Sequence, residues 1–112
     1  MQLLEQGLVH RFAMTLSARL RSGMPGQTAA HDDTALLERV ESAVLRGRSH
    51  GLQRDKDLTA FVRLTFVIAT NFDRHRPIND VLSSPDIASD EKISVLFASV
   101  SEFDWTLAAF YT

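Results

Sequence analysis

The fold class of this chain is decided by residues 55–71, which read DKDLTAFVRLTFVIATN. Asp55 or Asp57 starts a helix here, because a carboxylate near the first turn interacts favourably with the unpaired amide hydrogens. The apolar residues that follow point in almost every direction, and a helix of this kind is buried by neighbours on several sides. We therefore expect residues 55–71 to form a central helix. The side chains that should be mostly buried are Phe61, Leu64, Phe66 and Ile68.

Two helices are predicted upstream of this segment, because apolar residues recur there at helical spacing. The first covers residues 4–21, and residues 23–31 contain the glycine and proline of a loop. The apolar stripe of the first helix consists of Leu4, Leu8, Phe12, Leu16 and Leu20. The second helix begins where Asp32 or Asp33 caps it, and it ends at Gly51, which suits the left-handed position of a Schellman turn.

Two helices are also predicted downstream. Pro77 suits the first turn of a short helix that ends before Pro85, and Ser89 can cap a fifth helix. The apolar face expected for the fifth helix consists of Ile93, Leu96, Phe97 and Val100. Residues 103–112 either extend that helix or cover the bundle as a less regular tail.

Together these elements predict an all-α fold, because no stretch alternates apolar and polar residues long enough to indicate a strand. We expect a compact bundle of about five helices around a central buried helix. The chain has 112 residues, the length of one domain, and 45% of them are hydrophobic, which is an ordinary globular composition. Residues 1–112 are therefore expected to form a single helical domain.

Composition excludes several classes of site and partner. The chain has no cysteine, which excludes disulfides, thiolate metal sites and a cysteine nucleophile. Its net charge of −2 argues against a nucleic-acid partner, which a basic excess would attract. No apolar run approaches the roughly 20 residues of a membrane span. The start of the chain also lacks the pattern of a secretory signal, so we expect a cytoplasmic protein that does not bind membranes.

Reactive constellations are also missing from the sequence. No Gly-x-Ser-x-Gly element and no glycine-rich phosphate loop is present. The four histidines have no pair at the spacing that places two metal ligands on one helix face. The adjacent acids at predicted helix starts are explained by capping. We therefore expect no enzymatic activity, no cofactor, and no catalytic, cofactor-binding or metal-binding residues.

Two polar clusters remain, at residues 46–50 and residues 73–76. Their cationic side chains either serve the carbonyl groups at helix ends or form a charged surface that contacts another protein. Trp105 either packs at the edge of the core or is a binding hot spot. The candidate partner-binding residues are Arg46, Arg48, His50, Arg74, Arg76 and Trp105. Asp73 is expected to have a structural role, either holding amide hydrogens or pairing with Arg74 or Arg76.

The pattern from residue 37 to residue 96 resembles a known small helical domain. The elements that carry the resemblance are Arg48-x-x-Gly51-Leu52, Asp57-Leu58, Phe61-Val62-x-Leu64, Asn71-Phe72-Asp73, Pro77-x-x-x-x-Leu82, Lys92 and Leu96. They are similar to those of a small all-helical accessory protein family of bacterial type VI secretion effector gene clusters. In this chain His50 stands where that family has a tyrosine or a similar residue.

The resemblance implies a non-catalytic accessory module whose partner is another protein, namely a toxin effector or a secretion component. Such a module is an adaptor or chaperone for the effector, or its immunity protein. Two other functions stay open from the residues alone: a small helical transcriptional regulator and a small-molecule-binding domain. A regulator would lose DNA affinity steeply as the salt concentration rises. The sequence leaves the oligomeric state open.

Overall fold

The computed structural model describes the backbone of residues 2–112 and the side chains from residue 7 onward. Leu4, which we placed in the first apolar stripe, lies outside the residues whose side chains are described. Over residues 2–112 the chain forms helices and no strand, which confirms the all-α class. The α-helices are α1 (Gln2–Gly23), α2 (Pro25–Thr28), α3 (Asp33–Ser49), α4 (Asp55–Val67), α5 (Arg76–Ser83), α6 (Lys92–Ser99) and α7 (Glu102–Ala108). The 3₁₀ helices are η1 (Phe72–Arg74) and η2 (Ser89–Glu91).

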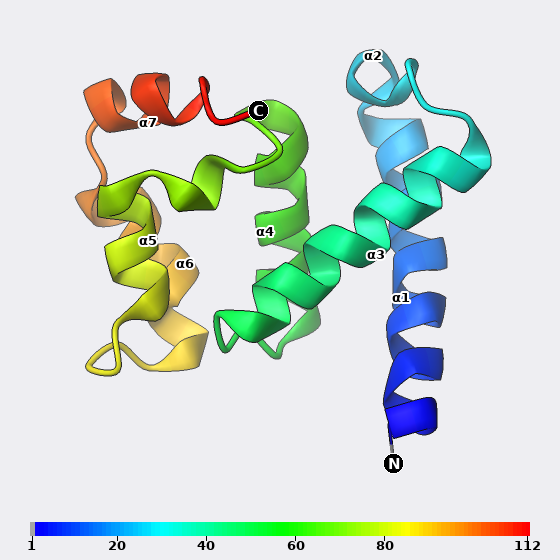
Figure 1. Ribbon diagram of the computed structural model, residues 1–112, viewed down its shortest axis with the longest axis horizontal. Helices are drawn as coiled ribbons and strands as arrows, with labels where there is room; N and C mark the ends of the chain where they lie inside the picture. Colours follow the sequence, from blue (N-terminus) through cyan, green and yellow to red (C-terminus); the bar gives the residue numbers. More distant parts are fainter. Residues whose placement is uncertain (1) are drawn as a thin grey trace.

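The helices form a broad, thin body that measures 35 × 33 × 19 Å (Figure 1). Helix α3 packs against α1 on one side and against α4 on the other. The C-terminal helices α5, α6 and α7 gather with η1 at the far end from α1. A thickness of 19 Å holds about two helices of 10–12 Å diameter, so the helices cannot all be enclosed.

This shape corrects the predicted central helix. Phe61 and Leu64 are buried as expected, whereas Phe66 and Ile68 are only partly buried, and Val67 is 56% exposed. Helix α4 contacts α3, α2 and α6 and packs Phe61 against Phe72 of η1, whereas the side that carries Lys56, Arg63 and Val67 is exposed. The predicted count of about five helices also differs from the seven α-helices found over residues 2–112. The additional elements are α2, which lies inside the predicted loop, and α7.

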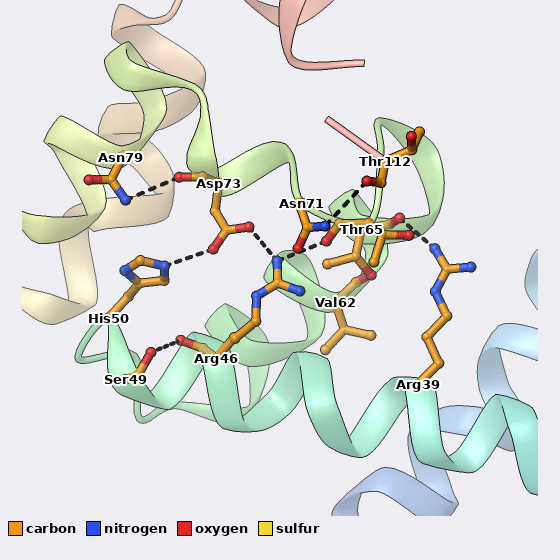
Figure 2. A network of polar contacts seen from close by, with 11 residues as sticks. Arg39, Arg46, Ser49, His50, Val62, Thr65, Asn71, Asp73, Asn79 and Thr112 are labelled. Atoms are coloured by element: carbon orange, nitrogen blue, oxygen red, sulfur yellow. Dashed lines mark hydrogen bonds and ion pairs between the residues drawn. The ribbon is translucent and has the colours of Figure 1, made fainter. Parts of the chain in front are cut away.

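The C-terminal end of α4 comes four residues earlier than residue 71. Two arginines of α3 donate hydrogen bonds to backbone carbonyl oxygens in this part of the chain. The Arg39 guanidinium donates to the Thr65 carbonyl oxygen at 2.7 Å, and Arg46 donates to the Thr70 carbonyl oxygen at 2.8 Å (Figure 2). Thr65 is one of the last four residues of α4, whose carbonyl groups need a partner outside the helix, and here Arg39 of α3 supplies it.

Helix α3 begins and ends where the sequence indicates. The Asp32 side chain accepts a hydrogen bond from the Ala35 amide at 2.8 Å, so Asp32 is the N-cap. At the other end, the Leu52 amide donates to the Gly47 carbonyl oxygen at 3.1 Å, and Gly51 has φ of 91°. This bond and the left-handed glycine define the predicted Schellman turn.

Replacing Gly51 tests that turn. We expect Gly51→Ala to lower the free energy of unfolding by about 1 kcal/mol, because a side chain disfavours the left-handed region. The new Cβ atom would also lie 3.3 Å from the Ser89 hydroxyl oxygen. Urea denaturation followed by circular dichroism measures the change. Gly7→Ala in α1 is the matched control, because nothing lies within 4 Å of its Cβ position and alanine favours a helix. Equal stability of the two variants would contradict the strain assigned to Gly51.

The core is one continuous cluster that extends from the α1–α3 contact, where Leu16, Leu36 and Val40 are buried, to the junction of α3 and α4 with the C-terminal helices. Its largest fully buried side chains come from α3, α4, η1, α5, α6 and the α3–α4 turn. They are Phe61, Phe72, Leu36, Leu52, Ile78, Leu82 and Leu96. Pro77 stands in the first turn of α5, and that helix ends at Ser83, as predicted.

Three details of the C-terminal part differ from the sequence-based expectation. Ser89 lies inside η2 and makes no side-chain cap, because a 3₁₀ turn precedes α6. The Lys92 ammonium group instead donates to the carbonyl oxygens of His50 at 2.8 Å and Leu82 at 2.6 Å, and so ties α6 to the ends of α3 and α5. Phe97 is 60% exposed, because α6 turns Ile93 and Leu96 toward the core. Residues 103–112 neither extend α6 nor form only an irregular tail, because a separate helix, α7, is followed by a short tail.

Candidate functional site

The two polar clusters of the sequence meet at Asp73, which is 5% exposed (Figure 2). Arg46 forms an ion pair with this carboxylate, and the Nε2 atom of His50 lies 3.0 Å from its Oδ2 atom. The expected pairing of Asp73 with Arg74 or Arg76 is therefore wrong. Residues 46 and 50 are four apart, which places both on the same side of the α3 terminus. That side faces η1, so the two side chains converge on one carboxylate.

The environment of Asp73 keeps its carboxylate charged. Burial raises the pKa of Asp73, but hydrogen bonds from His50 and Arg46 and the positive charge of Arg46 outweigh that effect. The net result is a pKa below the usual value of an aspartate. Arg46 and His50 therefore have an internal role, in which they fasten α3 to η1.

The other candidate cations have different surroundings. Arg48 is half-buried and lines a groove of about 590 Å³ between α1, α3 and the start of α4, where Asp55 brings a negative charge. Arg74 and Arg76 are exposed, and Arg76 lies 4.0 Å from Asp80 one helical turn away. Among the candidate cations, only Arg74 and Arg76 are thus exposed to solvent in the way a contact surface requires.

Trp105 belongs to a column of aromatic rings that runs from the core to the surface. The ring centroids of Phe61 and Phe72 are 5.2 Å apart, and Trp105 follows at 6.3 Å from Phe72. Phe97 stacks on the outer face of Trp105 at 6.0 Å. The half-buried Trp105 therefore packs at the edge of the core, and it supports an exposed phenylalanine above it.

Beside Phe97 lies a surface groove of about 340 Å³ between α4 and α6. Its apolar lining consists of Ala60, Leu64, Val67 and Phe97, and its polar lining consists of Lys56, Thr59 and Arg63. The lining thus contains two cations and no carboxylate. We refer to it as the α4–α6 groove.

Sequence reasoning missed the α4–α6 groove, because it placed Phe97 on the inward face of its helix and expected neighbours on several sides of residues 55–71. The sequence of α4 contained a signal that could have predicted an exposed apolar groove. A short chain has few helices with which to cover a helix that is apolar all round, so part of its apolar surface stays open. Exposed phenylalanines also occur outside the groove, at Phe103 and Phe110.

A second histidine–aspartate pair fastens α7. The Nε2 atom of His75 lies 3.0 Å from the Oδ1 atom of Asp104. Hydrogen bonds from His75 and then Ser101 lower the pKa of Asp104. The backbone amide of Asn71 also donates a hydrogen bond to the backbone carbonyl oxygen of Tyr111 at 2.8 Å. These contacts hold Trp105 and the C-terminal tail against η1.

Two other features, a metal-binding cluster and a membrane-spanning helix, are absent from the part of the chain that the structure describes. Those residues hold no group of three or more histidine, aspartate or glutamate side chains that could bind a metal ion. None of the helices they form has the length and apolar character needed to cross a membrane. Comparison of the chain with protein-family models, curated proteins and solved structures gives no match.

Proposed function

We propose that this protein is a non-catalytic module that binds another protein, and that its partner is a toxin effector or a secretion component. The observation that carries the proposal is the exposed apolar surface at the α4–α6 groove. Val67 and Phe97 are both more than half exposed there, and they lie beside two cations. Exposed apolar surface rimmed by polar groups marks protein contacts, and aromatic and arginine side chains are enriched among binding hot spots.

The polar lining of the groove favours a protein partner over a small molecule. A small-molecule site uses a few polar groups that converge from different directions to orient its ligand. In the α4–α6 groove all three polar side chains, Lys56, Thr59 and Arg63, come from one face of α4. A row of side chains along one helix suits an elongated partner surface.

Co-purification tests the proposed function. The tagged full-length chain is produced together with each product of the adjacent genes, and complexes are isolated by affinity and size-exclusion chromatography. We expect one of these products to co-elute with the chain. A toxicity test then separates the two roles, because an immunity protein restores growth of cells that make the toxin and an adaptor does not.

Failure to bind any product of the gene neighbourhood would contradict the proposal. A salt titration of DNA binding provides an independent control. A transcriptional regulator would bind DNA with an affinity that falls steeply as salt rises, whereas the proposed module should show no such binding.

We also propose that Arg74 and Arg76, which are exposed at the start of α5, contribute to the contact with the partner. We expect reversal of charge in an Arg74→Glu, Arg76→Glu variant to weaken partner binding roughly five-fold and to slow association at low salt. The melting temperature should stay unchanged because both side chains are exposed. Calorimetry and stopped-flow kinetics with the co-purified partner measure these effects.

Arg19→Glu is the matched control for that variant, since Arg19 is exposed on α1, at the opposite end of the molecule. Arg46 is unsuitable for this test because its reversal would break the pair with Asp73. Unchanged affinity and association rate in the Arg74→Glu, Arg76→Glu variant would exclude this edge from the interface.

A further inference from the structure

We infer that the α4–α6 groove binds a single amphipathic helix of the partner, one whose apolar stripe is flanked by acidic side chains. The inference rests on the proposed protein-binding function and names the part of the partner that docks. It follows from the shape of the groove, from the hydrogen bonding of its walls, from its charge, and from the support beneath Phe97.

The groove has the length and form of a helix seat. Its α4 wall extends from Lys56 to Val67, which is about three helical turns or roughly 16 Å. Along this wall the lining residues recur at three- and four-residue intervals, so they form one continuous stripe. Helix α6 contacts α4 and contributes Phe97 as the opposite wall. Side chains of a third helix fit between the ridges of two such packed helices.

The hydrogen bonding of the walls excludes a peptide that binds by adding a strand. A peptide that binds as an added strand needs a row of unpaired backbone groups, as at the edge of a sheet. Both walls of the groove are helices, whose backbone groups are paired within the helix. Near the end of α4, the Thr65 carbonyl oxygen also accepts a bond from Arg39. Recognition must therefore use side chains, and a helix presents side chains at the spacing that α4 offers.

The charge of the groove selects an acidic helix. Lys56 and Arg63 are seven residues apart, two turns along the same face of α4. Among the described residues no carboxylate forms an ion pair with either cation. The lining itself contains no acid. Glutamate or aspartate side chains two turns apart on the partner would pair with both cations, whereas basic side chains would be repelled.

Phe97 is an anchor that is ordered before binding. It stacks on Trp105, which stacks on Phe72 in the core, so the exposed ring is held from below. A side chain that is already held loses little conformational freedom when a partner covers it. Phe97 is therefore expected to be the hot spot around which the partner helix packs.

A displayed library of helical peptides about 14 residues long tests the inference, with the full-length chain as bait. We expect the selected peptides to carry apolar residues at helical spacing with glutamate or aspartate on the flanks. Fluorescence anisotropy then gives the Kd of labelled peptides. The Kd should rise at least ten-fold for Phe97→Ala and for the Lys56→Glu, Arg63→Glu variant. It should also rise between 50 mM and about 500 mM salt, because ion pairs at a surface are screened.

Leu45→Ala is the matched control for Phe97→Ala, since Leu45 is a similarly exposed apolar residue on α3 and does not line the groove. This variant should leave the Kd unchanged. Circular dichroism of each variant confirms that a loss of binding is not a loss of folding. Recovery of basic peptides, or unchanged binding by the Lys56→Glu, Arg63→Glu variant, would overturn the inference.

A second copy of the chain is the rival occupant. Light scattering that shows a dimer in the wild type and a monomer in Phe97→Ala would assign the groove to self-association and overturn the inference. A co-purified partner that binds the groove variants as tightly as the wild type would also overturn it, while leaving the proposed function intact. If no partner co-purifies but acidic helical peptides still bind through the groove, the result would contradict the proposed toxin or secretion partner and would leave the inference about the groove intact.

Discussion

Phe61→Ala is expected to lower the free energy of unfolding by about 3–5 kcal/mol, the largest effect of any single substitution considered. The Phe61 side chain is completely buried. Its ring lies 5.2 Å from that of Phe72 and 5.7 Å from that of His50, and it packs against Gly47 of α3. Removing the ring leaves a cavity at the junction of α3, α4 and η1. The close-packed side chains around it can relax only partially to fill it.

Urea denaturation measures this change, and the expected loss is a large share of the stability of an ordinary domain. Phe97→Ala provides the control, because it removes the same ring from an exposed position and should lower stability by less than about 1 kcal/mol. A melting temperature for Phe61→Ala only a degree or two below that of the wild type would show that Phe61 is not part of the core.

Asp73→Ala is expected to lower the free energy of unfolding by about 3 kcal/mol, because it leaves the part-buried guanidinium of Arg46 without its counter-charge. The substitution also removes the partner of His50 and loosens α3 from η1. Asp73→Asn should lose less stability than Asp73→Ala, since the amide oxygen of asparagine still accepts one hydrogen bond. Chemical denaturation of the three proteins at neutral pH gives the comparison.

Asp33→Ala is the control for Asp73→Ala. Asp33 pairs with Arg21, but the Asp33 side chain is fully exposed, so this ion pair should contribute little to stability. A protein with Asp73→Ala that is as stable as the one with Asp33→Ala would remove the structural role assigned to Asp73. A variant with unchanged stability but weaker partner binding would place Asp73 in the contact surface instead.

The lowered pKa of Asp73 predicts how stability depends on pH. A carboxylate with a native pKa below its unfolded pKa stabilises the native state fully above the unfolded value. That contribution is lost as the pH falls through the unfolded pKa, near 4, and then through the lower native pKa. The wild type should therefore lose stability on acidification more steeply than Asp73→Asn. Parallel curves for the two proteins below pH 5 would contradict the prediction.

The sequence by itself determined the helical class and the bounds of α3 and α5, because these depend on contacts between residues close along the chain. Asp32 caps α3 through an amide three residues away, and Gly51 closes the same helix through a left-handed turn. Pro77 stands in the first turn of α5 for a similarly local reason. Each of these residues has its effect wherever the helix packs, so the local pattern was sufficient.

The candidate site was only partly predictable, because helical spacing shows which residues share a face and not which face is covered. Phe97 lies beside the buried Leu96, yet α6 is turned so that Phe97 faces solvent. Val67 is apolar and exposed, because none of the described elements of this thin molecule covers the outer face of α4. The aromatic column did agree with one sequence-based alternative for Trp105, that of packing at the core edge.

Only the tertiary structure decided the roles of the charged residues. Arg46 and Asp73 are 27 residues apart, and the Lys92 ammonium group reaches carbonyl oxygens 42 and 10 residues away. Such partners are chosen by how whole helices cross, which depends on the shape of the entire core and not on local sequence. The charge of a residue is a property of the sequence. Whether that charge ties the fold together, as in Arg46, or faces a possible partner, as in Arg63, follows from the packing around it.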